Sequence, residues 1–239
     1  MAISAIIVAA GSGSRFGGDI PKQYLTIGSQ AVLDYSIQAF LSHNDIDEVV
    51  VVVSNSHKDF YQPIINKYKK LLPPVFGGED RSDSVKAGLE ALKSYSTEKV
   101  LIHDAARPFL SHEVIDRTIE ALQKEKAVIP VLPVFDTIKT GDGYVAETVD
   151  RSVLNRIQTP QGFCYKTLMQ AYAELPSFTD DAQAMEQKGI SVAMVVGDEM
   201  LLKITTPLDQ VFAEAIATTF EKKPLSANIA HKFIEPSVV

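Results

Sequence analysis

The chain has only one cysteine among its 239 residues, Cys164. An intramolecular disulfide is therefore impossible, which fits a reducing compartment, and we expect a cytoplasmic protein. Neither a CxxC nor an HExxH spacing occurs, so a structural zinc site is not expected. Cys164 has apolar neighbours and no histidine or cation close in sequence, which predicts a buried, inert thiol rather than a nucleophile.

An excess of positive charge is also missing. The sequence has 23 Lys and Arg residues against 30 Asp and Glu residues, which gives a net charge of −7. Proteins that bind nucleic acid in general are usually basic, so we expect no nucleic-acid partner, although a local basic pocket for a small anion stays possible. The apolar run near the N-terminus is too short to cross a bilayer and no basic segment precedes it. We therefore expect neither a signal peptide nor a membrane segment.

Apolar, strand-like runs alternate along the chain with helical patterns. Residues 48–53 contain five consecutive valines, which is typical of a strand buried on both faces. We expect strands at 3–9, 48–53, a short one ending at 76, 100–103, 127–134, 192–196 and 201–204. We expect helices at 32–41, 57–68, 82–92, 111–124, 165–175, 179–188 and 206–220. This order predicts an α/β fold with a largely parallel sheet and helices on both faces.

Three features come directly after predicted strands: Gly11, Gly77–Gly78 and Asp104. In open parallel sheets, ligands bind outside the carboxyl ends of the strands. One crevice could therefore gather these residues.

Residues 136–157 break the alternation and begin with a hairpin that turns at Gly141-Asp142-Gly143. An isolated hairpin is marginally stable, so this one must pack on something. The local pattern favours equally a hairpin folded over its own domain and one that packs on a partner subunit. We expect a single domain over 1–224 and a tail over 225–239 without periodic pattern.

The most informative segment follows the first predicted strand. Gly11-Ser12-Gly13 begins a GxGxxG pattern, but Phe16 takes the third glycine position, so a nicotinamide-type site is weakly supported. Gly13 and Gly18 have the spacing of a Walker A loop, but Asp19 follows where lysine is required. Two interpretations of this segment remain. It is either a looser phosphate loop with two nearby cations, Arg15 and Lys22, or a plain turn with two surface cations. We favour the phosphate loop.

An ordered set of motifs lies between residues 5 and about 210: Ala9-Ala10-Gly11-Ser12-Gly13-Ser14-Arg15, Pro21-Lys22-Gln23-Tyr24-Leu25, Gly77-Gly78-Glu79-Asp80-Arg81-Ser82-Asp83-Ser84-Val85, His103-Asp104-Ala105-Ala106-Arg107-Pro108, Asp136-Thr137-Ile138-Lys139, Val149-Asp150-Arg151, Gln158-Thr159-Pro160-Gln161, Thr179-Asp180-Asp181-Ala182 and Leu202-Lys203-Ile204-Thr205. Taken together, these motifs resemble the 2-C-methyl-D-erythritol 4-phosphate cytidylyltransferase family of isoprenoid synthesis. The resemblance implies a Rossmann-like, doubly wound, mostly parallel twisted sheet. It also implies a protruding β-arm at about 136–157 that clasps a second subunit of a homodimer.

The family's reaction would join CTP and 2-C-methyl-D-erythritol 4-phosphate (methylerythritol phosphate) to give the CDP-linked alcohol and pyrophosphate. The acceptor phosphate would attack the α-phosphorus of CTP in line. Its second pKa is about 6, so it is largely dianionic at pH 7 and needs no general base. The protein's task is then electrostatic, to bring two polyanions together and to stabilise the charge of the transferring group.

The resemblance also implies roles for single residues. Arg15 and Lys22 would stabilise the transition state and the leaving pyrophosphate, and Lys203 would contact the acceptor phosphate and the α-phosphate. The nucleotide would be held by Ala9, Ala10, Gly11, Gly13, Gly78, Glu79, Ser84, Asp104 and Ala105. Methylerythritol phosphate would meet Lys203, Arg107, Thr137, Arg151 and Thr159. Arg151, which is counted among the catalytic residues, and Thr137 would act from the arm in the neighbouring subunit's site.

Asp104 is a candidate ligand of Mg²⁺ or another divalent cation, because a carboxylate beside a polyphosphate is useful mainly where a cation is shared. A helix cap or a backbone contact explains Asp104 equally well. Asp180 and Asp181 are expected to shape a helix start, and His103 to pack or hydrogen-bond behind the site. The other histidines, at 43, 57, 112 and 231, are expected at the surface.

Two departures from the family pattern concern contacts to the nucleotide. Ser14 stands where many members have a basic residue, so one phosphate contact is lost or made by a hydroxyl group. Glu79 replaces the aspartate of some members, which could shift the ribose contact.

Three alternatives remain open at this stage. A ribitol-5-phosphate cytidylyltransferase shares the loop and several motifs, although Ala105-Ala106-Arg107 and Thr179-Asp180-Asp181-Ala182 favour methylerythritol phosphate. A non-catalytic nucleotide-binding protein of the same fold is disfavoured by the joint presence of Arg15, Lys22 and Lys203. The chain could also be one half of a bifunctional enzyme, but nothing after Lys223 resembles the start of the cyclodiphosphate synthase partner.

Overall fold

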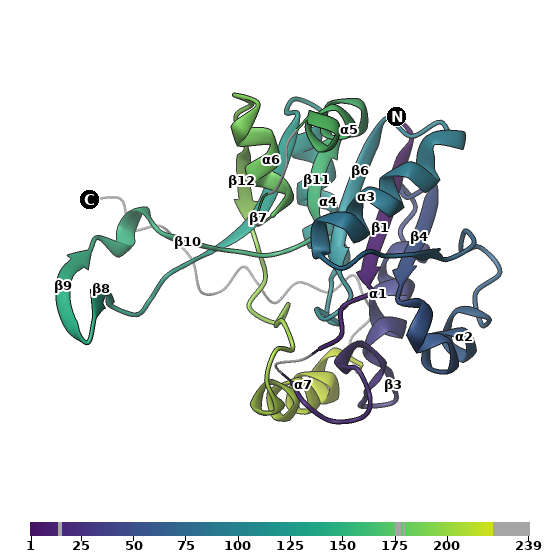
Figure 1. Cartoon of the computed structure of the whole chain (residues 1–239), viewed down its shortest axis with the longest axis horizontal. Coiled ribbons are helices and arrows are strands. Elements are labelled where there is room, and N and C mark those ends of the chain that lie inside the picture. Colours follow the sequence, from purple (N-terminus) through teal and green to yellow (C-terminus); the bar gives the residue numbers. More distant parts are fainter. Residues whose placement is uncertain (14–15, 175–177, 179, 222–239) are drawn as a thin grey trace.

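The computed structural model describes residues 1–13, 16–174, 178 and 180–221. In this part of the chain eight strands form one central sheet (Figure 1). The strands are β1 (Ile3–Ala9), β4 (Glu48–Val53), β5 (Val75–Phe76), β6 (Lys99–Asp104), β7 (Ala127–Pro133), β10 (Asn155–Ile157), β11 (Gln161–Cys164) and β12 (Ala193–Val196). The helices are α1 (Val32–Leu41), α2 (Lys58–Ile65), α3 (Arg81–Ala91), α4 (His112–Leu122), α5 (Tyr165–Glu174), α6 (Asp181–Gln187) and α7 (Pro207–Phe220).

The sheet is mixed, with a parallel centre. Its order is β10-β7-β11-β6-β1-β4-β5, and β12 also pairs with β7. The pairs β6–β1, β1–β4 and β4–β5 are parallel, as is β12–β7. The strands β10 and β11 run antiparallel to their neighbours. Because β6, β1 and β4 are parallel neighbours, their carboxyl ends meet at one edge, and the segments after them lie together.

Alternate side chains of the strands supply two apolar layers. On one face Ile7, Val51 and Leu101 are buried with residues of α1, α2 and α4. On the other face Ile6, Val50 and other residues pack against α3, α5 and α6. Helices therefore cover both faces, which confirms the doubly wound α/β fold expected from the order of the elements.

A third, smaller apolar cluster closes the carboxyl edge of the sheet on one side. It joins α7 to the short hairpin β2 (Thr26–Ile27) and β3 (Gln30–Ala31) through Ile27, Tyr35 and Ala217. Thr206 and Asp209 form a capping box at the start of α7, as Thr206-Pro207 predicts. The segment 201–206, which contains Lys203, is thus held between the main core and this cluster.

The β-arm extends away from the body of the protein in Figure 1. The strands β8 (Ile138–Asp142) and β9 (Tyr144–Val149) pair with each other and turn at Gly143, whose φ of 73° suits glycine. Along β9, Tyr144 is 90% exposed and Val145 68% exposed. The arm rejoins the sheet at β10, which pairs with β7. The hairpin is not folded over its own domain, so this alternative is excluded for a single chain.

Some expected elements differ in the structure. The helix expected at 57–68 is α2, preceded by a 3₁₀ turn at Asn55–His57, and it ends at Ile65. After it the backbone N–H groups of Lys67 and Tyr68 donate to carbonyl oxygens three residues earlier, in tighter turns than those of an α-helix. The prediction of a strand at 201–204 was wrong, because these residues have no regular secondary structure. Leu201 belongs to the first core cluster and Ile204 to the third, so these apolar side chains anchor a loop between two clusters.

The short strands β10 and β11 were not expected. Cys164, at the end of β11, is half-buried rather than buried. None of the helices in the described ranges combines the length and the apolar composition that a bilayer-crossing segment needs. The division into a domain at 1–224 and a tail at 225–239 stays a prediction, because residues 222–239 lie outside the described part.

Candidate functional site

Two adjoining cavities lie at the carboxyl edge of the central strands. The first has a volume of about 350 Å³ and is lined by Val8, Ala9, Ala10, Gly11, Ser12, Lys22, Gln23, Gly78, Glu79, Asp80, Arg81, Ser84, Asp104, Ala106 and Lys203. The second has a volume of about 150 Å³ and is lined by Arg81, Asp104, Arg107, Ile157, Gln158, Thr159, Gln161, Asp180 and Lys203. Arg81, Asp104 and Lys203 line both cavities and therefore form the wall between them.

The loop after β1 borders the first cavity. Gln23, which is buried, donates hydrogen bonds of 2.8 Å from its amide nitrogen to the carbonyl oxygens of Ala9 and Gly11. Gly13 has a φ of 69°, and a Cβ atom there would lie 3.6 Å from the backbone nitrogen of Lys22. The loop and the Lys22 segment are therefore held against each other. Arg15 and Ser14 lie outside the described residues, so the structure says nothing of their contacts.

The glycine pair after β5 lies beside the first cavity, which Gly78 lines. A Cβ atom at Gly77 would come within 2.5 Å of the Ala10 side chain and 2.4 Å of the Ser84 hydroxyl oxygen. Only glycine allows this approach without a shift of the neighbours. Asp80 and Asp83 form a capping box at the start of α3, so the positive end of this helix is presented at the cavity.

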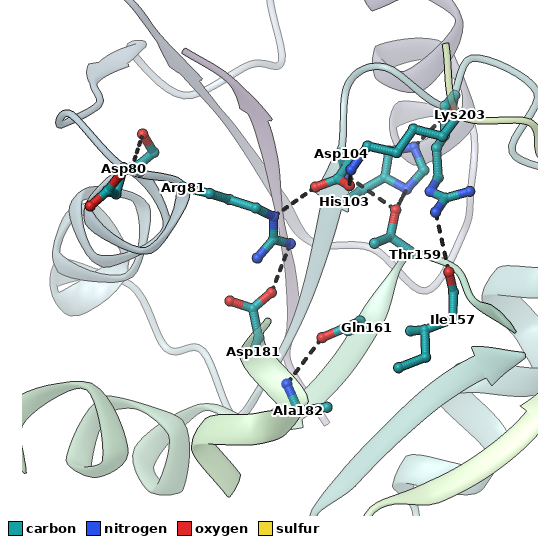
Figure 2. A network of polar contacts seen from close by, with 12 residues as sticks. Asp80, Arg81, His103, Asp104, Ile157, Thr159, Gln161, Asp181, Ala182 and Lys203 are labelled. Atoms are coloured by element: carbon teal, nitrogen blue, oxygen red, sulfur yellow. Dashed lines mark hydrogen bonds and ion pairs between the residues drawn. The ribbon is translucent and has the colours of Figure 1, made fainter. Parts of the chain in front are cut away.

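The wall between the cavities is built from charged side chains (Figure 2). Asp104, which is 8% exposed, accepts a hydrogen bond of 2.9 Å from Arg81 Nε on one carboxylate oxygen. It accepts another of 2.7 Å from Lys203 Nζ on the second oxygen. Burial alone would raise the pKa of Asp104, but the Arg81 and Lys203 cations hold that pKa far below its ordinary value. Asp104 is therefore a permanent carboxylate that fixes two cations.

A chain of hydrogen bonds lies behind Asp104. The backbone N–H of Asp104 donates to the hydroxyl oxygen of Thr159 at 3.1 Å, and this hydroxyl lies 3.0 Å from His103 Nδ1. His103 Nε2 lies 3.0 Å from the carbonyl oxygen of Arg107, which can only accept, so Nε2 carries the proton and Nδ1 accepts from Thr159. Burial lowers the pKa of His103 to about 4. The ring is thus neutral and, as expected, lies behind the site.

Arg107 joins two segments beside the second cavity. Its guanidinium group donates to the carbonyl oxygens of Leu201 at 3.0 Å and of Ile157 at 3.2 Å. The amide of Gln158 also bonds to the backbone of Asp198 and Leu201. The base of the arm and the loop that carries Lys203 are therefore fixed to each other at the second cavity.

The structure brings together most of the residues that the sequence singles out, with clear exceptions. Ala9, Ala10, Gly11, Lys22, Gly78, Glu79, Ser84, Asp104 and Lys203 line the first cavity, and Arg107 and Thr159 line the second. Gly13 and Ala105 line neither; Ala105 is buried in the core, and its neighbour Ala106 lines the first cavity instead. Thr137 and Arg151 lie on the exposed arm, outside both cavities of the same chain.

Sequence reasoning missed Arg81, Gln23 and the role of Asp181. Arg81 and Gln23 each lie inside a motif of the family resemblance, within three residues of a predicted site residue, and this position is the signal that could have indicated them. Asp180 does cap α6, because it accepts from the backbone of Gln183 at 2.8 Å. Asp181, in contrast, is fully buried and forms a salt bridge of 2.8 Å with Arg81.

In the described part of the chain, carboxylates that could bind a metal lie in two places. Each oxygen of Asp104 has one protein partner and keeps acceptor capacity, and Glu79 and Asp80 line the same cavity. Such hard oxygen donors, together with phosphate oxygens, suit Mg²⁺. Among the described residues, His43, Asp45 and Asp116 also bring three possible ligand atoms within 4.8 Å of one another.

The histidine group is a poor metal site. His43 is buried, contrary to the expectation of a surface residue. Its Nδ1 accepts from the backbone N–H of Asp45, and its Nε2 bonds to Asp116, so both ring nitrogens already have partners. The backbone N–H of Asp47, two residues after Asp45, donates to the carbonyl oxygen of Ile3 at the amino end of β1, so this group lies away from the two cavities.

The fold and the site define an α/β protein with one cavity beside the glycine-containing loop after β1 and a second cavity at the same edge of its sheet, separated by charged side chains. The family model described as IspD, 2-C-methyl-D-erythritol 4-phosphate cytidylyltransferase, matches residues 3–219. The chain belongs to this family.

Curated relatives are of two lengths. A bifunctional enzyme IspD/IspF from Paramagnetospirillum magneticum is 45% identical over 207 residues, which are 85% of this chain and 54% of that protein. A 2-C-methyl-D-erythritol 4-phosphate cytidylyltransferase from Clostridioides difficile is 42% identical over 220 residues, 89% of this chain and 92% of that protein. The chain thus spans about half the length of the bifunctional relatives and nearly the full length of the shorter one.

Solved structures agree with the fold. The 4-diphosphocytidyl-2C-methyl-D-erythritol synthase from Anaerococcus prevotii has a TM-score of 0.79 and 36% identity, covering 91% of this chain and 98% of that one. The 2-C-methyl-D-erythritol 4-phosphate cytidylyltransferase from Thermus thermophilus has a TM-score of 0.74 and 36% identity, covering 91% and 100% of the two chains. The Rossmann-like nucleotidyltransferase fold expected from the motifs is confirmed.

Proposed function

We propose that this chain transfers CMP from CTP to methylerythritol phosphate, which gives 4-CDP-2-C-methyl-D-erythritol and pyrophosphate. Family membership supports the choice of reaction. The observation that carries the proposal for this chain is the pair of adjoining cavities whose common wall is Arg81, Asp104 and Lys203. A transfer between two bound polyanions needs two sites that share cationic groups at their boundary.

The first cavity would bind CTP. The base and ribose would lie by Gly78, Glu79 and Ser84, where glycine allows close approach of the backbone. The triphosphate would lie along Gly11–Gly13, near Lys22 and the start of α3. Arg15, which follows this loop in sequence, would add a second cation.

The second cavity would bind the acceptor phosphate beside Thr159 and Arg107. An oxygen of this dianionic phosphate would attack the α-phosphorus, and the bond from that phosphorus to the oxygen that bridges to the β-phosphate would break. Lys203 would contact both the acceptor and the α-phosphate, while Lys22 and Arg15 would stabilise pyrophosphate as it leaves. No protein base is required, because the attacking oxygen carries no proton at pH 7.

A divalent cation, most simply Mg²⁺, would neutralise part of the triphosphate charge when bound. Asp104 is the carboxylate that would hold it, because it borders both cavities and keeps acceptor capacity on each oxygen. The protein's own contribution is to keep this carboxylate ionised and fixed between Arg81 and Lys203.

We further propose that the arm packs on a second copy of the chain, as a homodimer. In one chain the arm leaves Phe135, Tyr144, Val145 and Val153 at least 67% exposed, which is apolar surface that a partner would cover. Arg151 and Thr137 lie on this arm and would reach methylerythritol phosphate only in a partner's site. A single cytidylyltransferase domain at 1–224 and a cytoplasmic location complete the proposal.

The experiment that tests this function measures CTP-dependent release of pyrophosphate by the purified chain, with methylerythritol phosphate and ribitol 5-phosphate supplied separately. We expect turnover with methylerythritol phosphate and little with ribitol 5-phosphate. Preference for ribitol 5-phosphate would assign the alternative cytidylyltransferase activity. If no pyrophosphate is released with either acceptor and the chain still binds CTP, the result would favour a non-catalytic nucleotide-binding protein.

A further inference from the structure

Arg81 lies between two carboxylates that belong to different parts of the fold (Figure 2). Its Nε atom donates to Asp104, the last residue of β6, at 2.9 Å. Its Nη2 atom forms a salt bridge of 2.8 Å with Asp181, the first residue of α6. The guanidinium group of Arg81, the first residue of α3, thus connects the start of α6 to Asp104 in the wall between the two cavities.

Asp181 differs from Arg81 and Asp104 because it is completely buried and lines neither cavity. One of its oxygens faces Arg81, and the other accepts a hydrogen bond from the Tyr172 hydroxyl group on α5. Burial alone would lower the pKa of Arg81, but Asp181 and Asp104 raise it well above its ordinary value. Asp181 therefore acts on the site only through Arg81.

The contact between Arg81 and Asp181 also affects the position of Lys203. The position of Lys203 is set by Asp104, and the orientation of Asp104 is set by Arg81 on its other oxygen. An arginine side chain that faces a polyphosphate cavity is attracted to the phosphates unless a second anion retains it. With Asp181 neutralised, Arg81 would turn toward the bound nucleotide, and Asp104 and Lys203 would lose their alignment.

We infer that Arg81 is a positioning residue and that Asp181 is its anchor, so that α6 holds Asp104 and Lys203 at the boundary between the cavities. This inference rests on the proposed function, because it assigns Lys203 a place in the transfer. It predicts that a buried residue without access to either substrate controls turnover.

Asp34 offers a matched control. It is also a buried helix aspartate, 1% exposed, and it accepts one hydrogen bond from a lysine, Lys67, and one from a tyrosine, Tyr68, each at 2.8 Å. Asp34 lines neither cavity. Asp34→Asn and Asp181→Asn therefore remove equivalent buried charges, and only the second lies next to Arg81.

The test compares kcat, KM for CTP and thermal stability in the wild type, Asp181→Asn, Asp34→Asn and the charge-retaining Asp181→Glu. We expect both asparagine variants to melt at lower temperature. Only Asp181→Asn should lower kcat, on the order of 10-fold or more, with KM for CTP within about threefold, because alignment rather than nucleotide affinity is lost. Asp181→Glu should recover part of kcat. A kcat for Asp181→Asn within twofold of that for Asp34→Asn overturns the inference.

A second measurement does not depend on turnover. The lysines are dimethylated with ¹³C-formaldehyde, and the Lys203 resonance is assigned by its loss in Lys203→Arg. We expect this resonance to move in Asp181→Asn and to stay in place in Asp34→Asn; an unmoved resonance in Asp181→Asn overturns the inference. If the wild type releases no pyrophosphate with either acceptor, the proposed function fails, and the Lys203 resonance alone decides whether Asp181 positions this lysine.

Discussion

The Nζ atom of Lys203 lies 2.7 Å from a carboxylate oxygen of Asp104, the last residue of β6. The loop that carries Lys203 has no regular structure, so this contact, with the anchoring of Leu201 and Ile204, is what fixes the lysine at the sheet edge. Asp104 in turn is held by Arg81 on its other side. The wall between the cavities is therefore a row of alternating charges, each of which depends on its neighbours.

The first prediction concerns the stability of this row. Asp104→Asn removes the charge that two cations share and leaves the half-buried Arg81 with one carboxylate instead of two. We expect the free energy of unfolding to fall by about 3 kcal/mol, the size typical of breaking a buried ion pair from one side. Urea unfolding at pH 7.5 measures it. A loss below about 1 kcal/mol, as for an exposed pair, would contradict the account.

The second prediction concerns Lys22, which lines the first cavity. Lys22→Ala should lower kcat on the order of 10²-fold, because it removes a cation that acts on the charge developing in the transition state. The dissociation constant for CTP should change much less. Arg15→Ala should behave in the same way. Steady-state kinetics and calorimetric titration with CTP separate the two effects, and near-normal kcat in both variants would remove this role.

The third prediction concerns the pH dependence of stability. The pKa of His103 is lowered by burial from 6.5 to about 4. The unfolded chain therefore binds more protons than the folded chain between these values. The contribution of the neutral His103 to the free energy of unfolding is fully present above pH 6.5 and is lost as the pH falls toward 4. The pKa difference corresponds to about 3 kcal/mol.

Urea unfolding between pH 4 and 7.5 checks this prediction on the wild type and on His103→Gln. The variant should be less stable at pH 7.5, because its contacts to Thr159 and Arg107 are altered, but its stability should change less with pH. Parallel curves for the two proteins would show that His103 does not titrate as described.

The fourth prediction tests sharing of the site between subunits. Arg151 lies on the exposed arm, and Lys203 lies at the cavity wall. If the arm completes a partner's site, a mixture of Arg151→Ala and Lys203→Ala proteins should regain activity, since a hybrid dimer contains one site with neither substitution. Subunit exchange is verified by mass spectrometry of the mixed species. Verified exchange without any recovery would count against sharing.

Much of the fold could be predicted from the chain because its central strands are continuous apolar runs. β1 and β4 have the bounds that their sequences predict, and the order of the elements predicts helices on both faces. β10 and β11 are only three and four residues long, and so short a segment carries no clear period. Leu201 and Ile204 imitate a strand because they anchor a loop in two different clusters.

Site residues that directly follow a strand could be predicted from the sequence. Residues whose interaction partners lie far away along the chain could not. Gly11, Gly78 and Asp104 could be placed together because parallel strands end at one edge. Arg81 could not be distinguished from a surface cation, because its partners Asp104 and Asp181 lie 23 and 100 positions further along the chain. Only the folded arrangement shows that Asp181 is a charge partner as well as part of a helix start.

Transfer of CMP to the acceptor phosphate is tested most directly by ³¹P NMR of the purified chain with CTP, methylerythritol phosphate and Mg²⁺. We expect the signals of CTP and of the acceptor monophosphate to decline together, and a coupled pair of diphosphate doublets and a pyrophosphate signal to grow in equal amounts. Unchanged spectra, or pyrophosphate that forms with CMP while the acceptor monophosphate persists, would contradict transfer of CMP to the acceptor phosphate.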